Sequence, residues 1–485
     1  MDEADMRTDR PAAGGAPRHV VVIGGGIAGL AAAHRLLAGG VRVTLIEAGP
    51  RLGGKLRAGE LAGLPVDLGA ESVLARRPEA VDLARSVGLG AALQPPATAT
   101  AHLWTRGALR PMPRGHVMGV PGDLGPLAAS GVLSAEGLAR IGAERDLPPA
   151  EIGEDVAVGA YVAARLGREV VDRLVEPLLG GVYAGDAYRI SMRAAVPQLF
   201  EAARTHALLG DGVRALQSRA QSAPQSAGPV FAGIDGGIGR LPLAVAEACR
   251  AAGARILTDT PVRELVRTAG GWRVVAGAEA VEADGVVLAT PAGPAARLLE
   301  RPAPAAATVL RGVEYASMAL ITMAFRRRDL PEAVSGGGTS GFLVPPVDGR
   351  TIKASTFSSN KWAWAGADPE LFLLRTSVGR HGDEAELKRE DGELVAVSLA
   401  DLGEAVGLSA RPVASTVTRW DGGLPQYPVG HLDRVARIRA SVAALPGLAV
   451  CGALYDGVGI PACIASAHAA ADAVTTAFGT PGTDH

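Results

Sequence analysis

Residues 19–47 read HVVVIGGGIAGLAAAHRLLAGGVRVTLIE, and this stretch decides the fold class of the chain. Residues 19–23 are mostly apolar and β-branched, as expected of a buried parallel strand. Residues 27–37 have the Ala and Leu content of a helix, and residues 41–46 form a second apolar strand that Glu47 follows. The order predicts one βαβ unit and therefore an α/β fold with a parallel sheet.

Three glycines at the strand-to-helix turn, Gly24, Gly26 and Gly29, have the spacing G-x-G-x-x-G. The first permits a tight turn, the second lets a pyrophosphate approach the main chain, and the third lets the helix pack close to the strand. The helix N-terminus offers unpaired N–H groups to phosphates. The chain has 64 glycines, so the motif is informative because strand, helix and acid surround it in register.

Glu47 follows the second strand, where an acid accepts hydrogen bonds from ribose hydroxyls. A carboxylate there repels a 2′-phosphate, so NADP is disfavoured. The motif alone leaves NAD and FAD open. The alternative is a glycine-rich turn in an α/β domain that binds no dinucleotide, but it does not explain why all the parts occur in register.

Composition indicates a globular protein with no electrostatic signature for nucleic acid. Hydrophobic residues make up 48% of the chain and charged residues 20%, and the net charge is −2. Cys249, Cys451 and Cys463 have neither CxxC nor zinc spacing, which fits buried thiols in a reducing compartment. Residues 1–17 lack an apolar segment, so we expect a disordered tail, no secretory signal, no transmembrane segment and a cytoplasmic protein.

The residues after Glu47 extend the predicted site. Arg51, a glycine pair at 53–54 and Lys55 suit a second close approach of the main chain to phosphate or ring. Residues 65–72 then form a short strand and a turn. A simple nicotinamide enzyme needs none of these additions, whereas FAD is long and must be held along its length. The extended site therefore favours FAD.

The pattern G-x-G-x-x-G, followed by EAGPRLGGK at 47–55 and DLGAES at 67–72, resembles the flavin amine oxidases. Five later motifs narrow the resemblance to the protoporphyrinogen/coproporphyrinogen oxidase family of haem synthesis, closest to its soluble Gram-positive-type coproporphyrinogen III oxidases. These motifs are PMPRG at 111–115, EPLLGGVYAGD at 176–186, TRW at 418–420, LPQYPVGH at 424–431 and GVGIPACI at 457–464.

The resemblance implies an FAD site and a substrate site. The FAD-binding residues that it implies are Gly24, Gly25, Gly26, Ile27, Ala28, Gly29, Glu47, Ala48, Arg51, Gly54, Lys55, Gly69, Ala70, Glu71, Ser72, Val262, Thr290, Trp420, Gly459, Ile460 and Pro461. It places Arg76 and Arg77 near the cavity mouth, where they could bind substrate carboxylates; the alternative is a solvated surface pair. No catalytic side chain is identified, because the flavin N5 accepts the hydride.

The activity implied by the resemblance is the oxidation of coproporphyrinogen III to coproporphyrin III in three two-electron steps. Molecular oxygen reoxidises FAD and yields hydrogen peroxide, and the product passes to a ferrochelatase. Three alternatives remain: a protoporphyrinogen IX oxidase, another flavin oxidase acting on amines or polyenes, and a flavin- and porphyrin-binding protein without turnover. Aromatic residues make up only 4% of the chain, which argues against an aromatic amine cage.

We expect three domains. The family fold is a Rossmann-like FAD-binding domain of the amine oxidase type, with a mixed-sheet substrate domain and an inserted helical domain. The predicted FAD-binding parts are 18–94, 230–300 and 445–478, the helical domain is 95–217, the linker is 218–229, the substrate domain is 301–444 and the C-terminal tail is 479–485.

Four local predictions complete this interpretation. Residues 161–179 carry one helical apolar stripe, Val162, Leu166, Val170, Leu174 and Leu178, and the Glu176-Pro177 pair kinks or ends that helix. Residues 272–281 form a small hairpin. The PAPAAA segment at 302–307 marks a boundary. The last helix begins at Pro461 or Ala462, with its N-terminus directed at the flavin.

Overall fold

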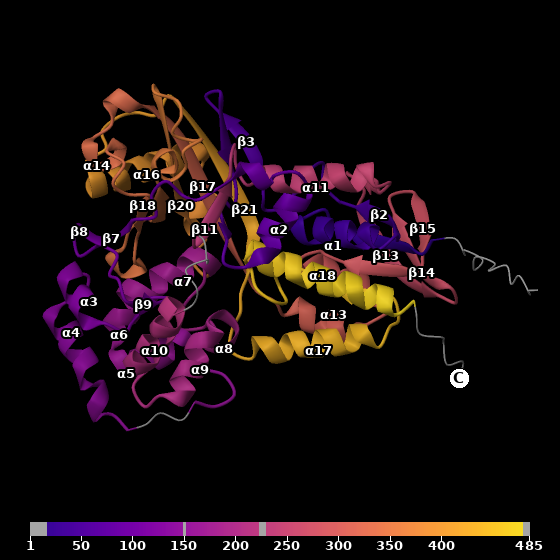
Figure 1. Ribbon diagram of the computed structural model, residues 1–485, viewed down its shortest axis with the longest axis horizontal. Coiled ribbons are helices and arrows are strands. Elements are labelled where there is room, and N and C mark those ends of the chain that lie inside the picture. Colours follow the sequence, from indigo (N-terminus) through magenta and orange to yellow (C-terminus); the bar gives the residue numbers. More distant parts are fainter. Residues whose placement is uncertain (1–16, 149–151, 223–228, 479–485) are drawn as a thin grey trace, which may run out of the picture.

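The computed structural model describes residues 17–148, 152–222 and 229–478. Figure 1 shows three regions: a parallel sheet covered by long helices, a larger mixed sheet at the upper left and a group of short helices at the lower left. The predicted tails lie outside the described residues, except Pro17. So do residues 223–228 of the predicted linker, whose first five residues, 218–222, are instead the last residues of a helix.

The parallel sheet has five strands in the order β12-β2-β1-β16-β22. Every neighbouring pair in it is parallel. The strands come from widely separated parts of the chain: β1 (His19–Ile23), β2 (Arg42–Ile46), β12 (Arg255–Leu257), β16 (Gly285–Leu288) and β22 (Leu448–Val450). The predicted βαβ unit is therefore the centre of a sheet to which the chain returns twice.

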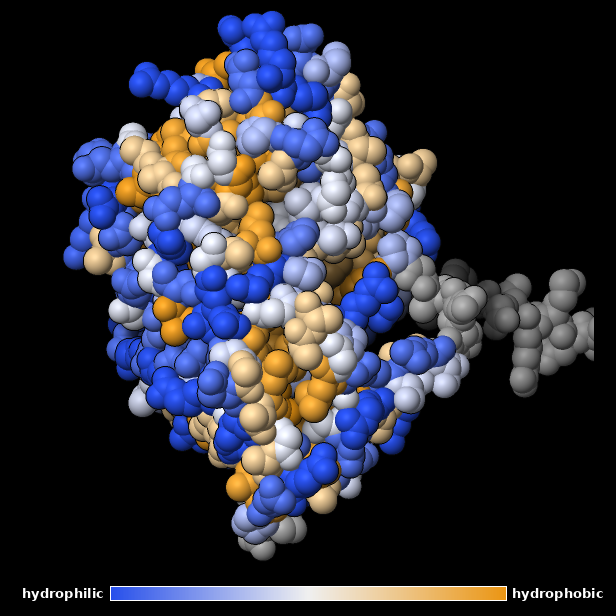
Figure 2. Space-filling model, turned by 90° about the vertical axis from the view of Figure 1, so that its left-hand side faces the viewer, coloured by the Kyte–Doolittle hydropathy of each residue, from blue (hydrophilic) through white to orange (hydrophobic). Residues whose placement is uncertain are grey.

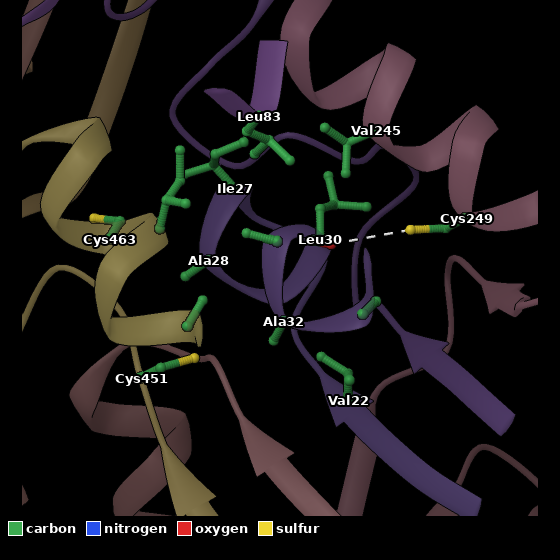
Figure 3. Close-up of a cluster of buried hydrophobic side chains, with 14 of the residues drawn as sticks. Val22, Ile27, Ala28, Leu30, Ala32, Leu83, Val245, Cys249, Cys451 and Cys463 are labelled. Carbon is green, nitrogen blue, oxygen red and sulfur yellow. Dashed lines mark hydrogen bonds between the residues drawn. The ribbon is translucent and has the colours of Figure 1, made fainter. Parts of the chain in front are cut away.

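One face of this sheet is covered by three helices, α1 (Ile27–Ala38), α11 (Arg240–Ala251) and α18 (Ile460–Thr476). Val20 and Val22 of β1 point into this layer, whereas the alternate residues point to the opposite face. Figure 3 shows the layer around Leu30, with the three cysteines at its edge. All three cysteines are buried, and the Cys249 thiol lies 3.9 Å from the Leu30 carbonyl oxygen.

The other face is covered by a three-stranded sheet and three helices. The sheet contains β13 (Val262–Thr268), β14 (Gly271–Ala276) and β15 (Glu279–Ala283), so the predicted hairpin is present with one further strand. The helices are α12 (Ala292–Leu299), α13 (Pro304–Arg311) and α17 (His431–Ala443). The prediction of a boundary at 302–307 was wrong in structural terms, because Pro304 begins α13 and Ala306 and Ala307 are buried against this face.

The larger sheet has seven strands in the order β21-β17-β20-β19-β18-β7-β8. They are β7 (Ala101–Thr105), β8 (Ala108–Pro111), β17 (Tyr315–Arg326), β18 (Gly341–Leu343), β19 (Ile352–Thr356), β20 (Leu371–Val378) and β21 (Ala414–Pro425). Helix α16 (Asp391–Val406) packs on one face of it. The opposite face, which includes Ala324 and Leu373, shares a hydrophobic cluster with Leu61, Val66 and Leu68.

Two strands of this sheet, β7 and β8, fall in the range predicted to be mostly helical. The prediction of helix was wrong there because Arg106 and Gly107 both have positive φ, 53° and 72°, and form a tight hairpin turn. The β-prone run around Trp104 was the available signal.

The predicted single helix at 161–179 is broken into four pieces. These are α5 (Val158–Leu166), α6 (Arg168–Val170), a π-helical segment (Val171–Val175) and α7 (Glu176–Tyr183). The stripe is buried through Leu174, but the next buried leucine is Leu179 instead of Leu178, because the wider π turn advances the buried face by one residue. Glu176-Pro177 begins α7 and does not end the helix.

Shorter elements complete the described chain. The helices are α2 (Pro78–Ser86), α3 (Leu124–Ser130), α4 (Ala135–Gly142), α8 (Met192–Ala195), α9 (Pro197–Thr205), α10 (Leu209–Ser222), α14 (Glu332–Ser335) and α15 (Ser358–Lys361); the strands are β3 (Ala58–Leu61), β4 (Leu64–Asp67), β5 (Val73–Leu74), β6 (Leu93–Gln94), β9 (His116–Val117), β10 (Val120–Pro121) and β11 (Phe231–Ile234). Figure 2 shows the face at the left of Figure 1, where apolar side chains form separate patches with charged residues between them.

Candidate cofactor and substrate site

The glycine turn between β1 and α1 divides into positions that shape the chain and one that leaves space. Gly24 has φ +109°, and a Cβ added to Gly29 would lie 1.8 Å from the Gly24 carbonyl oxygen. These two positions therefore require glycine for the turn and the helix contact. A Cβ on Gly26 would meet no atom closer than the Gly54 Cα at 4.0 Å. The space beside Gly26 is the space that a pyrophosphate needs.

The N-terminus of α1 opens toward this space. Gly26 is its N-cap, and no side chain caps the helix. The Glu47 carboxylate lies beside the turn and accepts hydrogen bonds from the Gly25 N–H at 2.6 Å and the Gly49 N–H at 2.9 Å. Because each oxygen has a main-chain donor, the carboxylate is held in one orientation at the tip of β2.

A cavity extends from this turn toward the larger sheet, with about 1300 Å³ of space including its part open to solvent. Ten of the predicted FAD-binding residues line it: Gly24, Gly26, Ile27, Ala28, Glu47, Ala48, Gly54, Lys55, Val262 and Thr290. They come from four separate segments of the chain. The Thr290 hydroxyl is buried and has no hydrogen-bond partner within the described residues, as expected where a ligand supplies one.

A second group of predicted residues lies beside the cavity and supports it. The Arg51 guanidinium lies 5.6 Å from the Trp420 ring centroid and donates to the Gly54 carbonyl at 2.7 Å. The Trp420 indole N–H donates to the Leu68 carbonyl at 3.0 Å. A Cβ on Gly69 would lie 2.0 Å from the Lys55 carbonyl oxygen, so these segments pack main chain to main chain. The structure thus brings both motif segments and Trp420 together.

Glu71 has a different role from the one implied by the resemblance. Its side chain is 6% exposed and forms ion pairs with Lys361 at 2.6 Å and Arg375 at 3.1 Å. Burial alone would raise the pKa of Glu71, but the two cations lower it overall. The carboxylate therefore fastens the 69–72 turn to the larger sheet, with Ala70 and Ser72 on either side of it in the chain.

The first turn of α18 reaches the same cavity. Gly459 is the N-cap without a side-chain cap, Ile460 and Pro461 begin the helix, and Cys463 lines the cavity together with Lys55. Burial lowers the pKa of Lys55 and raises the pKa of Cys463 to about 12, so Cys463 is a neutral thiol. An uncapped helix N-terminus at this position stabilises negative charge on a bound group.

The two predicted substrate arginines are not part of this cavity. Arg77 is the N-cap of α2 and forms an ion pair with Glu79 at 2.6 Å, and Arg76 is exposed. Neither side chain lines the cavity described above.

Several cavity residues were missed by reasoning from the sequence. Arg297 on α12 and Lys55 are the two cationic residues among those that line the cavity. Tyr315 lines it too, and its hydroxyl accepts a hydrogen bond from the Ala292 N–H at 2.9 Å. Pro425 joins from the end of β21. These residues carried no local signal, because their placement depends on how distant segments pack. Cys463 lies within the GVGIPACI motif, and this motif was the available signal for it.

The fold and cavity define a dinucleotide-binding α/β protein. A glycine turn with room at Gly26, two uncapped helix N-termini, a fixed acid and an unpartnered hydroxyl all face one cavity. The residues therefore fit a dinucleotide with a diphosphate in its middle.

Comparison with known proteins identifies the family. Residues 27–475 match the family of flavin containing amine oxidoreductases, and the chain belongs to this family. Its cofactor is FAD, and the chain is a flavin oxidoreductase. None of the helices in the described ranges is long and apolar enough to cross a bilayer.

Three similar proteins cover nearly the whole chain. A coproporphyrinogen III oxidase of Mycobacterium tuberculosis is 37% identical over 471 residues, covering 95% of this chain and 98% of that protein. A coproporphyrinogen III oxidase of Bacillus subtilis is 32% identical, covering 95% and 99%. The crystal structure of a putative protoporphyrinogen oxidase from Exiguobacterium is 31% identical with a TM-score of 0.83, covering 96% of this chain and all of that one.

Proposed function

We propose that this protein oxidises coproporphyrinogen III to coproporphyrin III, with molecular oxygen as the final electron acceptor. The observation that carries this proposal is the 37% identity to a coproporphyrinogen III oxidase over 95% of the chain. The cavity described above supplies the complementary support, because ten of the residues predicted to bind FAD line it.

The chemistry requires little acid–base help from the protein. A porphyrinogen has four methylene bridges, each between two pyrroles, and loss of a hydride leaves a cation delocalised over both rings. FAD, when bound, supplies the hydride acceptor. A pyrrole N–H can release its proton to water, so no side-chain base is needed. The task of the chain is to orient the substrate and to exclude competing reactions.

The face of the larger sheet opposite α16 fits this task. Met318 of β17 lies opposite Trp420 of β21, and Leu320 lies opposite Thr418. Met318 and Leu320 carry no titratable group, so these two side chains offer apolar contact. In α7, a Cβ added at Gly180 or Gly181 would meet no atom within 4 Å. Open space beside a smooth helix suits a broad macrocycle.

Turnover on two porphyrinogens tests the proposal. We expect the flavin-loaded protein to convert coproporphyrinogen III to a fluorescent porphyrin with three equivalents of hydrogen peroxide, and to convert protoporphyrinogen IX more slowly. Faster turnover of protoporphyrinogen IX would show that this porphyrinogen is the preferred substrate. Absence of porphyrin with both compounds would contradict the proposed oxidation altogether.

The variant Gly26→Val tests the cofactor site within the same proposal. Its side chain fills space that no protein atom occupies, so we expect a folded chain without yellow colour or turnover. Normal flavin content would contradict the pyrophosphate position. In Gly29→Ala, by contrast, the Cβ meets the Gly24 carbonyl, so this variant should lose folded protein as well as flavin.

Two wider features belong to this proposal. We infer a cytoplasmic protein, supported by three buried free cysteines, and a transfer of coproporphyrin III to a ferrochelatase. Transfer predicts that added ferrochelatase inserts iron at the same rate when a porphyrin scavenger is present. A rate that falls to zero with the scavenger would show release into solution instead.

A further inference from the structure

Lys353 is a buried lysine on the larger sheet without an acidic partner. Its side chain belongs to β19, where a bulge between Ile352 and Ala354 interrupts the register with β20. The residue is 8% exposed, and its ammonium lies 3.9 Å from the Met318 sulfur, a weak acceptor. Burying an ammonium with such a poor partner is unfavourable unless a ligand compensates it.

A second cation lies close to Lys353. Arg380 follows β20 and donates to the Val344 carbonyl at 3.2 Å. Within the described parts of the chain, no carboxylate forms an ion pair with Lys353 or Arg380. Burial, and then the charge of Arg380, lower the pKa of Lys353 to about 7. The two positive groups are therefore near enough to repel each other.

The nearest acid on the facing helix compensates them poorly. Glu176 begins α7, and its carboxylate accepts a hydrogen bond from the Ala187 N–H at 2.6 Å. Burial raises the pKa of Glu176 to about 7, so at neutral pH it carries only part of a charge. Asp383 acts on Arg380 in the same sense as Glu176, so Arg380 is partly compensated and Lys353 is the cation without a carboxylate partner in the described chain.

Lys353 and Arg380 are each connected to a cavity. Met318 contacts Lys353 and lies opposite Trp420 in the neighbouring strand. Trp420 packs against Gly69, and Gly69 packs against the main chain of Lys55, which lines the flavin cavity. On the other side, Arg380 lines a second cavity with about 950 Å³ of space including its open part, together with the carboxylates of Asp172, Glu176, Asp186 and Asp383. Lys353 is thus linked to the flavin cavity through the packing of Met318 and Trp420, and Arg380 faces the second cavity.

We propose that Lys353 and Arg380 bind a propionate carboxylate of the tetrapyrrole while its ring lies against Met318 and Trp420. This inference rests on the proposed function, because the carboxylate is that of the substrate or product. A desolvated carboxylate between two cations forms charge-assisted hydrogen bonds and neutralises both of them. The pair would select tetrapyrroles with a carboxylate at the matching position of the ring.

Binding of the product separates this inference from turnover. Coproporphyrin III and its tetraamide have the same macrocycle, but the tetraamide carries no negative charge. Quenching of porphyrin fluorescence gives both dissociation constants with the flavin-loaded protein. We expect wild type to bind the tetra-acid at least tenfold more tightly than the tetraamide. In Lys353→Met the tetra-acid should bind about tenfold more weakly and the tetraamide unchanged, while Lys353→Arg stays within threefold of wild type.

Lys388→Met is the matched control, because Lys388 is exposed and the substitution is the same. It should bind both compounds as wild type does. Equal affinities of wild type for the tetra-acid and the tetraamide would overturn the inference even if Lys353→Met failed to fold. So would equal weakening of both compounds in Lys353→Met. Failure of the proposed function would show differently, as absence of porphyrinogen oxidation by wild type.

Discussion

Two clusters of buried cations lie on the larger sheet, and they differ in what neutralises them. Lys361 and Arg375 both pair with Glu71, whose side chain is 6% exposed. Lys353 has no such carboxylate among the described residues, and Arg380 forms no ion pair there, although the charges of Glu176 and Asp383 act on it. The first cluster is complete within the chain and joins the 69–72 turn to the sheet. In the second, we propose that a substrate carboxylate is the partner of Lys353.

This difference separates a charge that stabilises the fold from a charge that binds a ligand. Breaking a buried ion pair leaves an uncompensated charge, so the complete cluster should be costly to disrupt. Removing an uncompensated charge should cost nothing in stability and should weaken only ligand binding. Substitutions in the two clusters should therefore have opposite effects on stability and on affinity.

The largest effect is expected for Glu71→Gln. The substitution keeps the shape of the side chain and leaves Lys361 and Arg375 buried without their anion, so the free energy of unfolding should fall by about 3–5 kcal/mol. Denaturant unfolding of the flavin-free protein measures it. Glu282→Gln is the control, because its ion pair with Arg273 is exposed and should contribute no more than about 1 kcal/mol. Equal decreases in the free energy of unfolding for the two variants would show that the Glu71 ion pairs stabilise the fold no more than an exposed pair does.

A smaller effect of opposite sign is expected for Lys353→Met. The variant removes a buried ammonium that has no carboxylate partner, so the free energy of unfolding without ligand should rise by about 1 kcal/mol at neutral pH. Thermal unfolding of the flavin-free protein measures the change. A fall of about 3 kcal/mol, like that expected for Glu71→Gln, would mean that Lys353 is paired within the protein.

The pH dependence of this stability difference gives a finer test. The pKa of Lys353 is lowered from 10.5 to about 7 in the folded protein. Between these values the unfolded chain binds more protons, so the stability of wild type rises with pH, by at most about 1.4 kcal/mol per pH unit. Lys353→Met lacks this rise, and its advantage should shrink from pH 7 to pH 9.

Two groups near Lys353 bear on this pH window. Arg380 stays charged, whereas Glu176, whose pKa is raised to about 7, completes the loss of its proton at the lower end of the window. Both proteins share these groups. A stability difference that stays constant over the window would contradict the buried position of the ammonium.

The smallest effect is expected for Arg77→Met. The family resemblance places this residue near the cavity mouth, but in the structure it pairs with Glu79 at the start of α2. We expect a loss of no more than about 1 kcal/mol in stability and less than a twofold change in KM for coproporphyrinogen III. A tenfold rise in KM would show that Arg77, and not Lys353, binds the substrate carboxylate.

The cofactor half of the site could be predicted from sequence, because it depends on local main-chain geometry. Gly24, Gly26 and Gly29 act through their own turn, and Glu47 and the uncapped N-terminus of α1 lie in the same βαβ unit. The same local logic predicted the start of α18 to within two residues.

The substrate half could not be predicted in this way. Lys353 stands in an ordinary strand, and its isolation results from a bulge, from Arg380 and from a facing helix that begins after a π turn. Nothing in the sequence near Glu71 indicated that Lys361 and Arg375 would neutralise it. The predicted helical domain at 95–217 also includes the β7-β8 hairpin, which adds to the larger sheet through the pairing of β7 with β18.

Anaerobic mixing of the flavin-loaded protein with coproporphyrinogen III tests the central claim most directly. The account predicts that the oxidised flavin band bleaches in a single turnover, that coproporphyrin fluorescence appears after further flavin equivalents or after air is admitted, and that hydrogen peroxide forms on reoxidation. A flavin band that stays oxidised at saturating coproporphyrinogen III, with no porphyrin formed in air, would contradict it.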